Sequence, residues 1–226
     1  MDKFKKTVSA KLFWIVILGI VLYAVLDVIA QLLPPHYSPI SQAESDLAVG
    51  KFGLIMTVNF LNRGVLSLLF IFGFLRTLDV KGVARLPFRT GTYLLMVWAV
   101  GALLLAIFPT DVPATPVSWH EAIHLVVAII AFIGGAFGTL AISIKLGQNR
   151  LFEGLKRIAL PLSVLVILFW AIEFGLPFVF PHLNAHIGGL TERLFLGSVL
   201  LWIGVVSAHL ATHMQPAKAV SNQTQS

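Results

Sequence analysis

The sequence predicts an all-α integral membrane protein, a single bundle of six transmembrane helices with both termini in the cytoplasm. Three observations lead to this prediction: the composition, six long apolar runs, and the placement of the basic residues. Of the 226 residues, 58% are hydrophobic and 12% are charged, whereas soluble domains are about 45–50% apolar and about 25% charged. So much apolar surface requires lipid as the solvent. The absence of cysteine also excludes a disulfide scaffold and a thiolate metal site.

Six runs are long enough to cross a bilayer, whose core of about 30 Å needs about 20 apolar residues. The predicted spans are residues 12–33, 52–75, 88–108, 119–144, 158–180 and 188–210. Lipid admits only helices and closed barrels, and barrel strands would alternate over about ten residues, so these continuous runs predict helices. Residues 1–214 form one membrane domain, and the polar residues 215–226 are expected to be a disordered cytoplasmic tail. The first run exceeds a signal-peptide core and is expected to stay in the protein.

The basic residues define the orientation. Thirteen of the sixteen lysines and arginines lie before span one, after spans two and four, or in the tail. Cytoplasmic loops carry the excess of basic residues, so both termini are expected on the cytoplasmic side of a plasma membrane. The net charge of +6 therefore does not indicate nucleic-acid binding, because these short segments face anionic lipid.

Charged residues inside the spans are candidates for function, since such residues usually face the bundle interior or a water-filled cavity. They are Asp27, Arg63, Glu173, Glu192 and Arg193. Arg63 lies near mid-membrane, and Asn59 and Ser67 lie one turn away on the same helix face. This polar stripe must face inward. Either Asp27 or Glu173 lies at a depth from which it could neutralise Arg63.

Two interpretations of these charges remain open. They could be structural ion pairs that hold the helices in register, or they could line a pocket open to the outside. In the second case we expect convergence of Asp27, Asp46, Arg63, Asp111, His124, Glu173, Glu192 and Arg193, with Asn59 as a further lining residue. Seven of the ten acidic residues lie on the outer side or in the outer half, which favours a cation over an anion.

Residues 120–124 match the pattern H-E-x-x-H, which on a helix places two imidazoles on one face to bind zinc. His182 and His186 enter span six from the same side, so the zinc candidates are His120, His124, His182 and His186. A competing interpretation needs no metal: Ser118 and Glu121 have the spacing of a capping box at a helix start, and Ser41 with Glu44 repeats it. The zinc site is the weaker of the two interpretations.

Gly134 and Gly138 in span four form a G-x-x-x-G pair, which is typical of close helix packing. The pair could pack within one chain or between two chains of a homo-oligomer. Membrane lipids are the other expected partners.

Motifs along most of the chain resemble a known family. They include Tyr37-Ser38-Pro39-Ile40-Ser41, Ser45-Asp46-Leu47, Asn59-Phe60, Gly64, Phe108-Pro109-Thr110-Asp111, His124 and Glu192-Arg193. Together they are similar to the bacterial and archaeal six-helix membrane proteins grouped as domain of unknown function 998. The resemblance implies a prokaryotic inner membrane and a shared outer site of Ser45, Asp46, Asp111, His124 and Arg193, but no reaction. Family members tend to have a small residue at the position of Glu121, so H-E-x-x-H looks like a local feature of this chain.

The sequence leaves three functions open. The first is binding or transport of a lipid head group, a cation or a small polar solute in the outer pocket. The second is a membrane-embedded hydrolase or acyl-transfer enzyme, possibly zinc-dependent, with His124 as base or metal ligand and Asp111, Asp46 or Ser45 as further catalytic candidates. The third is a structural bundle that modulates partner proteins.

Overall fold

The computed structural model describes residues 2–111, 116–149 and 152–213, and in this part of the chain every regular element is helical. The elements are α1 (Asp2–Leu32), η1 (Glu44–Ala48), α2 (Gly53–Val80), η2 (Leu86–Phe88), α3 (Arg89–Leu105), α4 (Trp119–Leu146), α5 (Glu153–Val179) and α6 (Pro181–His213). Six helices are long and apolar enough to cross a membrane. The predicted six-helix, all-α class is therefore confirmed.

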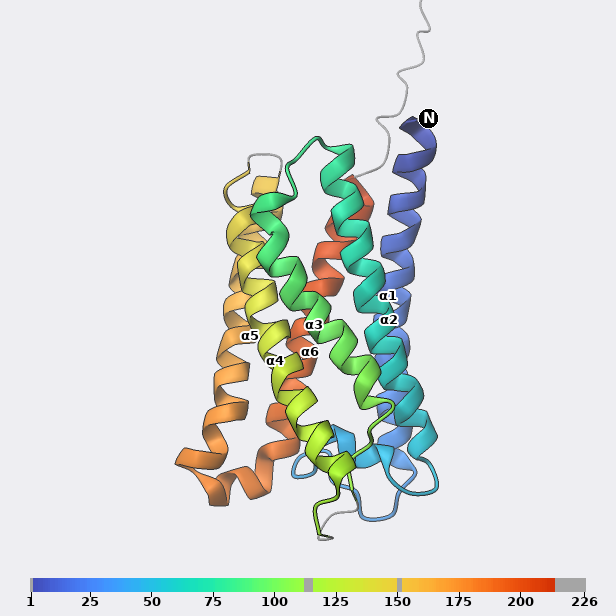
Figure 1. Ribbon diagram of the computed structural model, residues 1–226, viewed down its shortest axis with the longest axis vertical. Helices are drawn as coiled ribbons and strands as arrows, with labels where there is room; N and C mark the ends of the chain where they lie inside the picture. The colour runs from blue at the N-terminus through green and yellow to red at the C-terminus, as the bar shows by residue number, and fades with distance from the viewer. Residues whose placement is uncertain (1, 112–115, 150–151, 214–226) are drawn as a thin grey trace, which may run out of the picture.

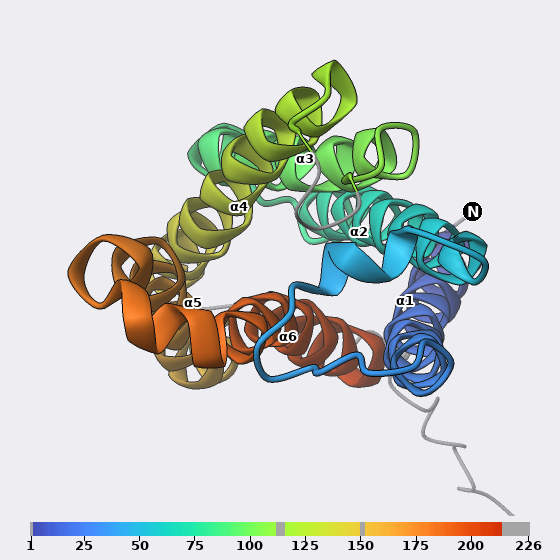
Figure 2. The ribbon, with the colours of Figure 1, turned by 90° about the horizontal axis from the view of Figure 1, so that it is seen from below.

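The six long helices form a closed ring. Each packs on the next along the chain, and α6 returns to pack on α1. α1 begins and α6 ends at the same end of the bundle (Figure 1). This end also carries the α2–α3 connection with Lys81 and Arg85, the end of α4 with Lys145 and the start of α5 with Lys156 and Arg157, and we call it the basic end. At the opposite end, the segment between α1 and α2 crosses the mouth of the ring (Figure 2).

Helix boundaries differ from the predicted spans at several points. α3 ends at Leu105, three residues before the predicted end of its span, and α6 begins at Pro181, seven residues before the predicted start. Proline is favoured at the first position of a helix because that position needs no N–H donor, which accounts for the early start of α6. The predicted tail 215–226 lies outside the described residues.

The glycine pair of α4 packs against α3 of the same chain. A Cβ atom at Gly134 would lie 2.6 Å from the carbonyl oxygen of Leu94, and one at Gly138 would lie 2.9 Å from the backbone nitrogen of Leu95. Small residues let two helix backbones approach this closely. The face formed by Gly134 and Gly138 is thus occupied within the chain, which accounts for the pair without a homo-oligomer.

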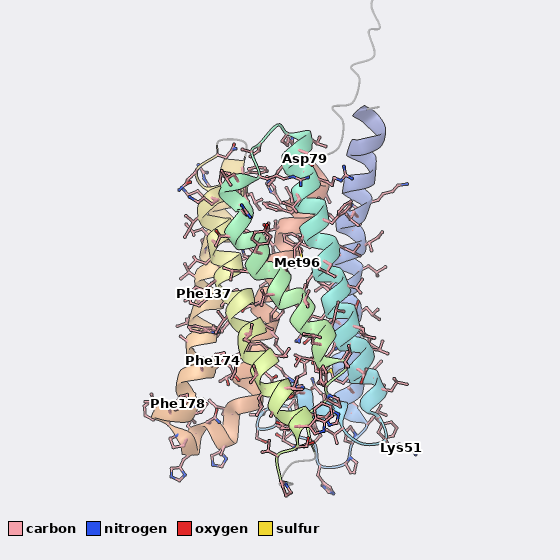
Figure 3. The ribbon with its side chains drawn as sticks, in the orientation of Figure 1. Lys51, Asp79, Met96, Phe137, Phe174 and Phe178 are labelled. Atoms are coloured by element: carbon pink, nitrogen blue, oxygen red, sulfur yellow. The ribbon has the colours of Figure 1, made fainter. Side chains whose placement is uncertain are left out.

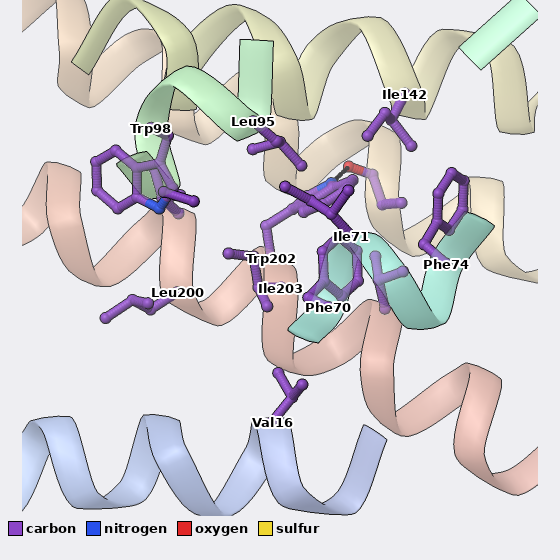
Figure 4. Close-up of a cluster of buried hydrophobic side chains, with 14 of the residues drawn as sticks. Val16, Phe70, Ile71, Phe74, Leu95, Trp98, Ile142, Leu200, Trp202 and Ile203 are labelled. Atoms are coloured by element: carbon purple, nitrogen blue, oxygen red, sulfur yellow. Dashed lines mark hydrogen bonds between the residues drawn. The ribbon is translucent and has the colours of Figure 1, made fainter. Parts of the chain in front are cut away.

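The aromatic core fills the half of the ring nearest the basic end. Phe70 stacks on Phe74 at 6.0 Å and meets Trp202 edge-on at 5.7 Å between ring centroids. The indole Nε1 of Trp202 donates a hydrogen bond to Ser143 Oγ at 2.9 Å. Figure 4 shows these rings packed with side chains of α1, α3 and α4. Trp98 lies at the edge of this core, where the packing gives way to a cavity.

The outer surface of the ring is apolar. Large side chains such as Leu18 and Ile130 are half exposed or more, as expected where lipid replaces water. Asp79 and Lys51 lie at opposite ends of the bundle, with Met96 and Phe137 between them (Figure 3). At the basic end, Arg85 and Asp79 form an exposed ion pair.

Candidate functional site

A cavity of about 440 Å³, which we call the inner cavity, lies inside the ring in the half opposite the basic end. It is bounded by α2, the end of α3, α4, α5, α6 and the segment that crosses the mouth. Its apolar lining includes Phe60, Leu105, Leu125, Ile129, Phe132, Phe174 and Phe178, and its polar lining is Ser41, Ser45, Arg63, His124, Glu173, Asn184 and Glu192. The volume falls within the usual range for ligand pockets, about 300–1,000 Å³.

Arg63 is the most deeply buried charge of the inner cavity, with 1% of its surface exposed. Its guanidinium carbon lies 5.2 Å from the ring centre of Phe60 and 5.0 Å from that of Trp98. Within the described residues the guanidinium makes no hydrogen bond or ion pair, and its Nε is buried without a partner. Buried charges are normally paired and hydrogen-bonded because desolvation is costly, so Arg63 is a cation that lacks its counter-ion.

The polar stripe of α2 faces inward, as its helical spacing predicted. Asn59, Arg63 and Ser67 are all buried. Asn59 Nδ2 donates to the carbonyl of Tyr23 at 3.2 Å, and Ser67 Oγ accepts from Trp98 Nε1 at 3.2 Å. The two neighbours of Arg63 therefore bind other helices and hold α2 in a fixed rotation, which directs Arg63 into the inner cavity.

Neither of the partners predicted for Arg63 forms an ion pair with it in the described part of the chain, so this prediction is corrected. Asp27 lies 4.0 Å from Arg193 and accepts a hydrogen bond from Gln31 at 2.5 Å. Glu173 accepts from the hydroxyl of Thr191 at 2.5 Å. The rise per residue of a helix predicts how deep these carboxylates lie in the membrane. It does not predict toward which neighbouring helix each of them points.

His124 contributes a second polar group on the α2–α4 side of the inner cavity. Its Nδ1 lies 2.7 Å from the carbonyl oxygen of Phe108. A carbonyl only accepts, so Nδ1 carries the proton and Nε2 of the neutral ring is an acceptor. The connection between α3 and α4 thus fixes the tautomer and orientation of His124.

Glu173 and Glu192 line the opposite side, on α5 and α6. Glu192 accepts a hydrogen bond from the backbone N–H of Glu44 at 2.7 Å. Within the described part of the chain, neither carboxylate forms an ion pair, so the inner cavity has a positive side and a negative side.

Glu44 ties η1 to the bundle and was not predicted as a site residue. Its buried carboxylate accepts the hydroxyl of Tyr23 at 2.5 and 2.6 Å. Burial raises the pKa of Glu44 from 4.5 to about 7. The capping box predicted for Ser41 and Glu44 is wrong, because Glu44 bonds across the bundle instead of to its own helix end. A tyrosine within an otherwise apolar run was the signal for such a partner.

Arg193 holds the segment that crosses the mouth. Its Nη1 donates to the carbonyls of Pro39, Gln42 and Gly189, each at 3.0 Å. Its Nη2 donates to the hydroxyl of Tyr37. The contact is so close at Gly189 that a Cβ there would lie 2.0 Å from the Gln42 oxygen. Arg193 therefore serves as a clamp on the segment and does not line the inner cavity.

A second cavity of about 380 Å³ lies between α1 and α6. Asp27, Arg193 and Glu44 line it, together with Tyr23 and apolar side chains. The expected single pocket is thus divided: Arg63, His124, Glu173 and Glu192 share the inner cavity, while Asp27 and Arg193 border the second one. Asn59, Asp46 and Asp111 line neither of these two cavities.

Asp111 and Glu121 secure the start of α4. Ser118 is the N-cap, and its hydroxyl accepts from the backbone N–H of Glu121 at 3.3 Å, as the capping box predicted. The second bond of a capping box, from the backbone N–H of Ser118 to the Glu121 carboxylate, is replaced. Glu121 instead accepts from Thr110 Oγ1 and from the Asp111 N–H. Asp111 accepts from the N–H and the hydroxyl of Ser118 at 2.6 and 2.8 Å. These bonds lower the pKa of Asp111, which is not hydrogen-bonded to His124.

The four histidines considered for zinc are dispersed. His120 stacks on Trp119 at 3.5 Å, whereas His124 lines the inner cavity. His182 and His186 are exposed at the start of α6. Among the described residues, no three His, Asp or Glu side chains gather as a metal-binding group.

Of the remaining catalytic candidates, Ser45 lines the inner cavity and Asp46 lies beside it on η1. Burial raises the pKa of Asp46. His124 has a carbonyl and no carboxylate on Nδ1, so neither Asp46 nor Asp111 orients it.

The comparisons with known proteins give one family. The DUF998 family, described as proteins of unknown function, matches residues 17–209. No curated protein and no solved structure matches the chain. The matched range includes the polar lining of the inner cavity and the Arg193 clamp. Since the match covers most of its length, the chain belongs to the DUF998 family.

Proposed function

We propose that this protein is a multi-pass protein of a prokaryotic plasma membrane with both termini in the cytoplasm. The support is the basic end. Its basic residues lie in the α2–α3 connection and at the adjoining ends of α3, α4 and α5, and they are Lys81, Arg85, Arg89, Lys145, Lys156 and Arg157. Helix α1 begins and α6 ends at this same end of the bundle (Figure 1). Positively charged connections remain on the cytoplasmic side. The inner cavity then lies in the half of the bundle within the outer leaflet.

Its function is to bind an amphiphilic molecule, such as a membrane lipid, by the head group. The observation that carries this proposal is the lining of the inner cavity, which joins buried charged groups to a wall of apolar side chains. A small polar solute would leave the phenylalanines of the wall without an apolar partner. A lipid satisfies both parts, because its head group needs polar contacts and its chains need apolar ones.

The apolar wall continues to the lipid-facing surface. Leu125 on α4 and Phe178 on α5 both line the inner cavity, yet 48% and 85% of their surfaces are exposed. Figure 3 shows Phe174 and Phe178 on the half of α5 that lies farther from the basic end. Lipid chains can therefore remain in the bilayer between α4 and α5 while the head group occupies the cavity. This geometry also suits transfer of a lipid without its complete extraction.

Binding is favoured over hydrolysis by the surroundings of His124. A histidine base in hydrolases is oriented by a third group, usually a carboxylate. Here the backbone carbonyl of Phe108 takes that place. The carbonyl fixes Nε2 as a hydrogen-bond acceptor, which suits contact with a hydroxyl or protonated group of a ligand.

The test is co-purification of lipid. The protein is purified in mild detergent, and bound phospholipid is counted by native mass spectrometry. Ala128→Phe fills the inner cavity from α4, whereas Val126→Phe adds the same ring on the exposed side of that helix. We expect wild type and Val126→Phe to retain phospholipid and Ala128→Phe to lose it at equal thermal stability. Equal retention by both variants contradicts the proposal.

A further inference from the structure

We propose that the ligand of the inner cavity has a zwitterionic head group, with its anionic group on Arg63 and its ammonium group on Glu173 and Glu192. This inference rests on the proposed function and specifies its ligand. It follows from the separation of charge in the cavity, with a cation on α2 and two carboxylates on α5 and α6.

The positive side lacks an anion. Arg63 is 1% exposed, lines the inner cavity and has no hydrogen-bond or ion-pair partner among the described residues. The rings of Phe60 and Trp98 lie near its guanidinium carbon. Aromatic faces attract a cation but accept none of the guanidinium N–H donors as an oxygen does. A phosphate or carboxylate oxygen matches the planar donors of arginine in geometry and charge.

Glu44 is the acidic residue that interacts electrostatically with Arg63 from the segment across the mouth. Its carboxylate is held by the Tyr23 hydroxyl and borders the second cavity. No ion pair joins it to Arg63 in the part of the chain described. An anionic group in the inner cavity would therefore supply the contact that Glu44 does not make.

The negative side lacks a cation. Glu173 has the Thr191 hydroxyl as its hydrogen-bond donor, and Glu192 has the Glu44 amide. Arg193, the nearest basic residue along the chain, directs its donors to carbonyls and to Tyr37. Two carboxylates that line one cavity repel each other. An ammonium group between them relieves that repulsion, and the ring of Phe174 beside Glu173 adds an aromatic neighbour.

The two sides together select for a molecule with both charges. A lipid with only an anionic head group would satisfy Arg63 but leave the repelling carboxylates unpaired. A lipid with only a cationic head group would leave Arg63 unpaired in the interior. A head group with phosphate and amine compensates both, so phosphatidylethanolamine is the probe that fits this charge pattern.

The experiment compares three lipids on the purified full chain by native mass spectrometry: phosphatidylethanolamine, phosphatidylglycerol and a trimethylammonium lipid with the same acyl chains. We expect wild type to bind phosphatidylethanolamine about tenfold more tightly than either of the others. Arg63→Gln should weaken phosphatidylethanolamine binding about 10- to 100-fold, the usual effect of losing a hydrogen bond to a charged group. Glu173→Gln should abolish the preference over phosphatidylglycerol. Arg76→Gln, on the exposed face of α2, is the matched control and should change nothing.

The outcomes separate this inference from the proposed function. Equal binding of all three lipids by wild type, or an unchanged preference in Glu173→Gln, overturns the zwitterionic ligand and leaves amphiphile binding in place. Failure of wild type to bind any lipid refutes both. If Arg63→Gln does not fold, Arg63→Lys tests the same side, because it keeps the charge but loses the planar donors. It should weaken binding of both phosphate-containing lipids and leave the trimethylammonium lipid unaffected.

Discussion

The guanidinium carbon of Arg63 lies 5.0 Å from the centre of the Trp98 ring, at the boundary between the aromatic core and the inner cavity. The indole of Trp98 is itself fixed, since its Nε1 donates to Ser67 one turn along α2. The guanidinium of Arg63 therefore packs against a fixed aromatic ring, and its N–H groups make no hydrogen bond to the described residues. A side chain of this kind lowers the stability of the empty protein and is suited to binding an anion.

Replacement of Arg63 by methionine should separate stability from binding. Replacing a whole buried ion pair by apolar side chains is often neutral or stabilises by about 1–4 kcal/mol, and replacing Arg63 leaves no ion-pair partner behind among the described residues. We expect Arg63→Met in lipid-free detergent to unfold at the same temperature as wild type or at a higher one. Thermal unfolding followed by circular dichroism measures this, and a marked loss of stability would show that Arg63 is a structural cation.

Position 189 requires glycine because the segment that crosses the mouth passes very close to α6 there. A Cβ at this position would lie 2.0 Å from Gln42 O, whereas one at Gly197 on the same helix has nothing within 4 Å. Gly189→Ala should lower the free energy of unfolding by about 1–3 kcal/mol or more, as overpacking does. Gly197→Ala should leave it unchanged or raise it by about 0.5–1 kcal/mol. Denaturant titration of the two variants tests the pair, and equal effects contradict the account.

The Arg193 clamp should depend on its planar donors. Arg193→Lys keeps the charge but cannot reach Pro39, Gln42 and Tyr37 together. We expect the free energy of unfolding to fall by at least about 1.5–3 kcal/mol, the contribution of one hydrogen bond to a charged group. The backbone amides of residues 37–43 should also exchange hydrogen faster in Arg193→Lys than in wild type. Arg76→Lys is the control, and unchanged exchange in Arg193→Lys would exclude the clamp.

Glu44 should make stability depend on pH between 4.5 and 7. Its folded pKa of about 7 exceeds the ordinary 4.5, so in this interval the folded protein holds a proton that the unfolded chain has released. Stability from this group is complete below pH 4.5 and is lost as the pH rises to about 7. Melting temperatures of wild type and Glu44→Gln across this interval check it. The variant should show a flatter profile, and parallel profiles would contradict the assignment.

The sequence predicted the features that local periodicity controls. Helical spacing placed Asn59, Arg63 and Ser67 on one buried face, and the cap of α4 by Ser118 followed from its spacing to Glu121. These depend on residues three or four positions apart, which interact within a single turn. The six long helices followed from apolar length alone.

The contacts between distant elements were not predictable in this way. Depth in the membrane placed Asp27 near Arg63, but the closed ring turns Asp27 toward Arg193. The path of the polar segment across the mouth decides the roles of Arg193, Tyr37 and Glu44, and hydropathy contains no information about that path. The expected preference for a cation also rested on the number of outer carboxylates alone. Several of these carboxylates accept hydrogen bonds from the protein itself, as Glu44 does from Tyr23 and Asp111 does from Ser118.

Photo-crosslinking shows directly whether a lipid occupies the inner cavity. A phosphatidylethanolamine with a diazirine near the glycerol is incorporated at low density, and labelled residues are mapped by mass spectrometry. We expect labelling to concentrate on cavity residues such as Leu125, Ile129 and Phe174, to be competed by unlabelled phosphatidylethanolamine and to be absent in Ala128→Phe. Labelling that follows surface exposure alone, with α1 residues such as Leu18 labelled as strongly as those of the cavity, would contradict it.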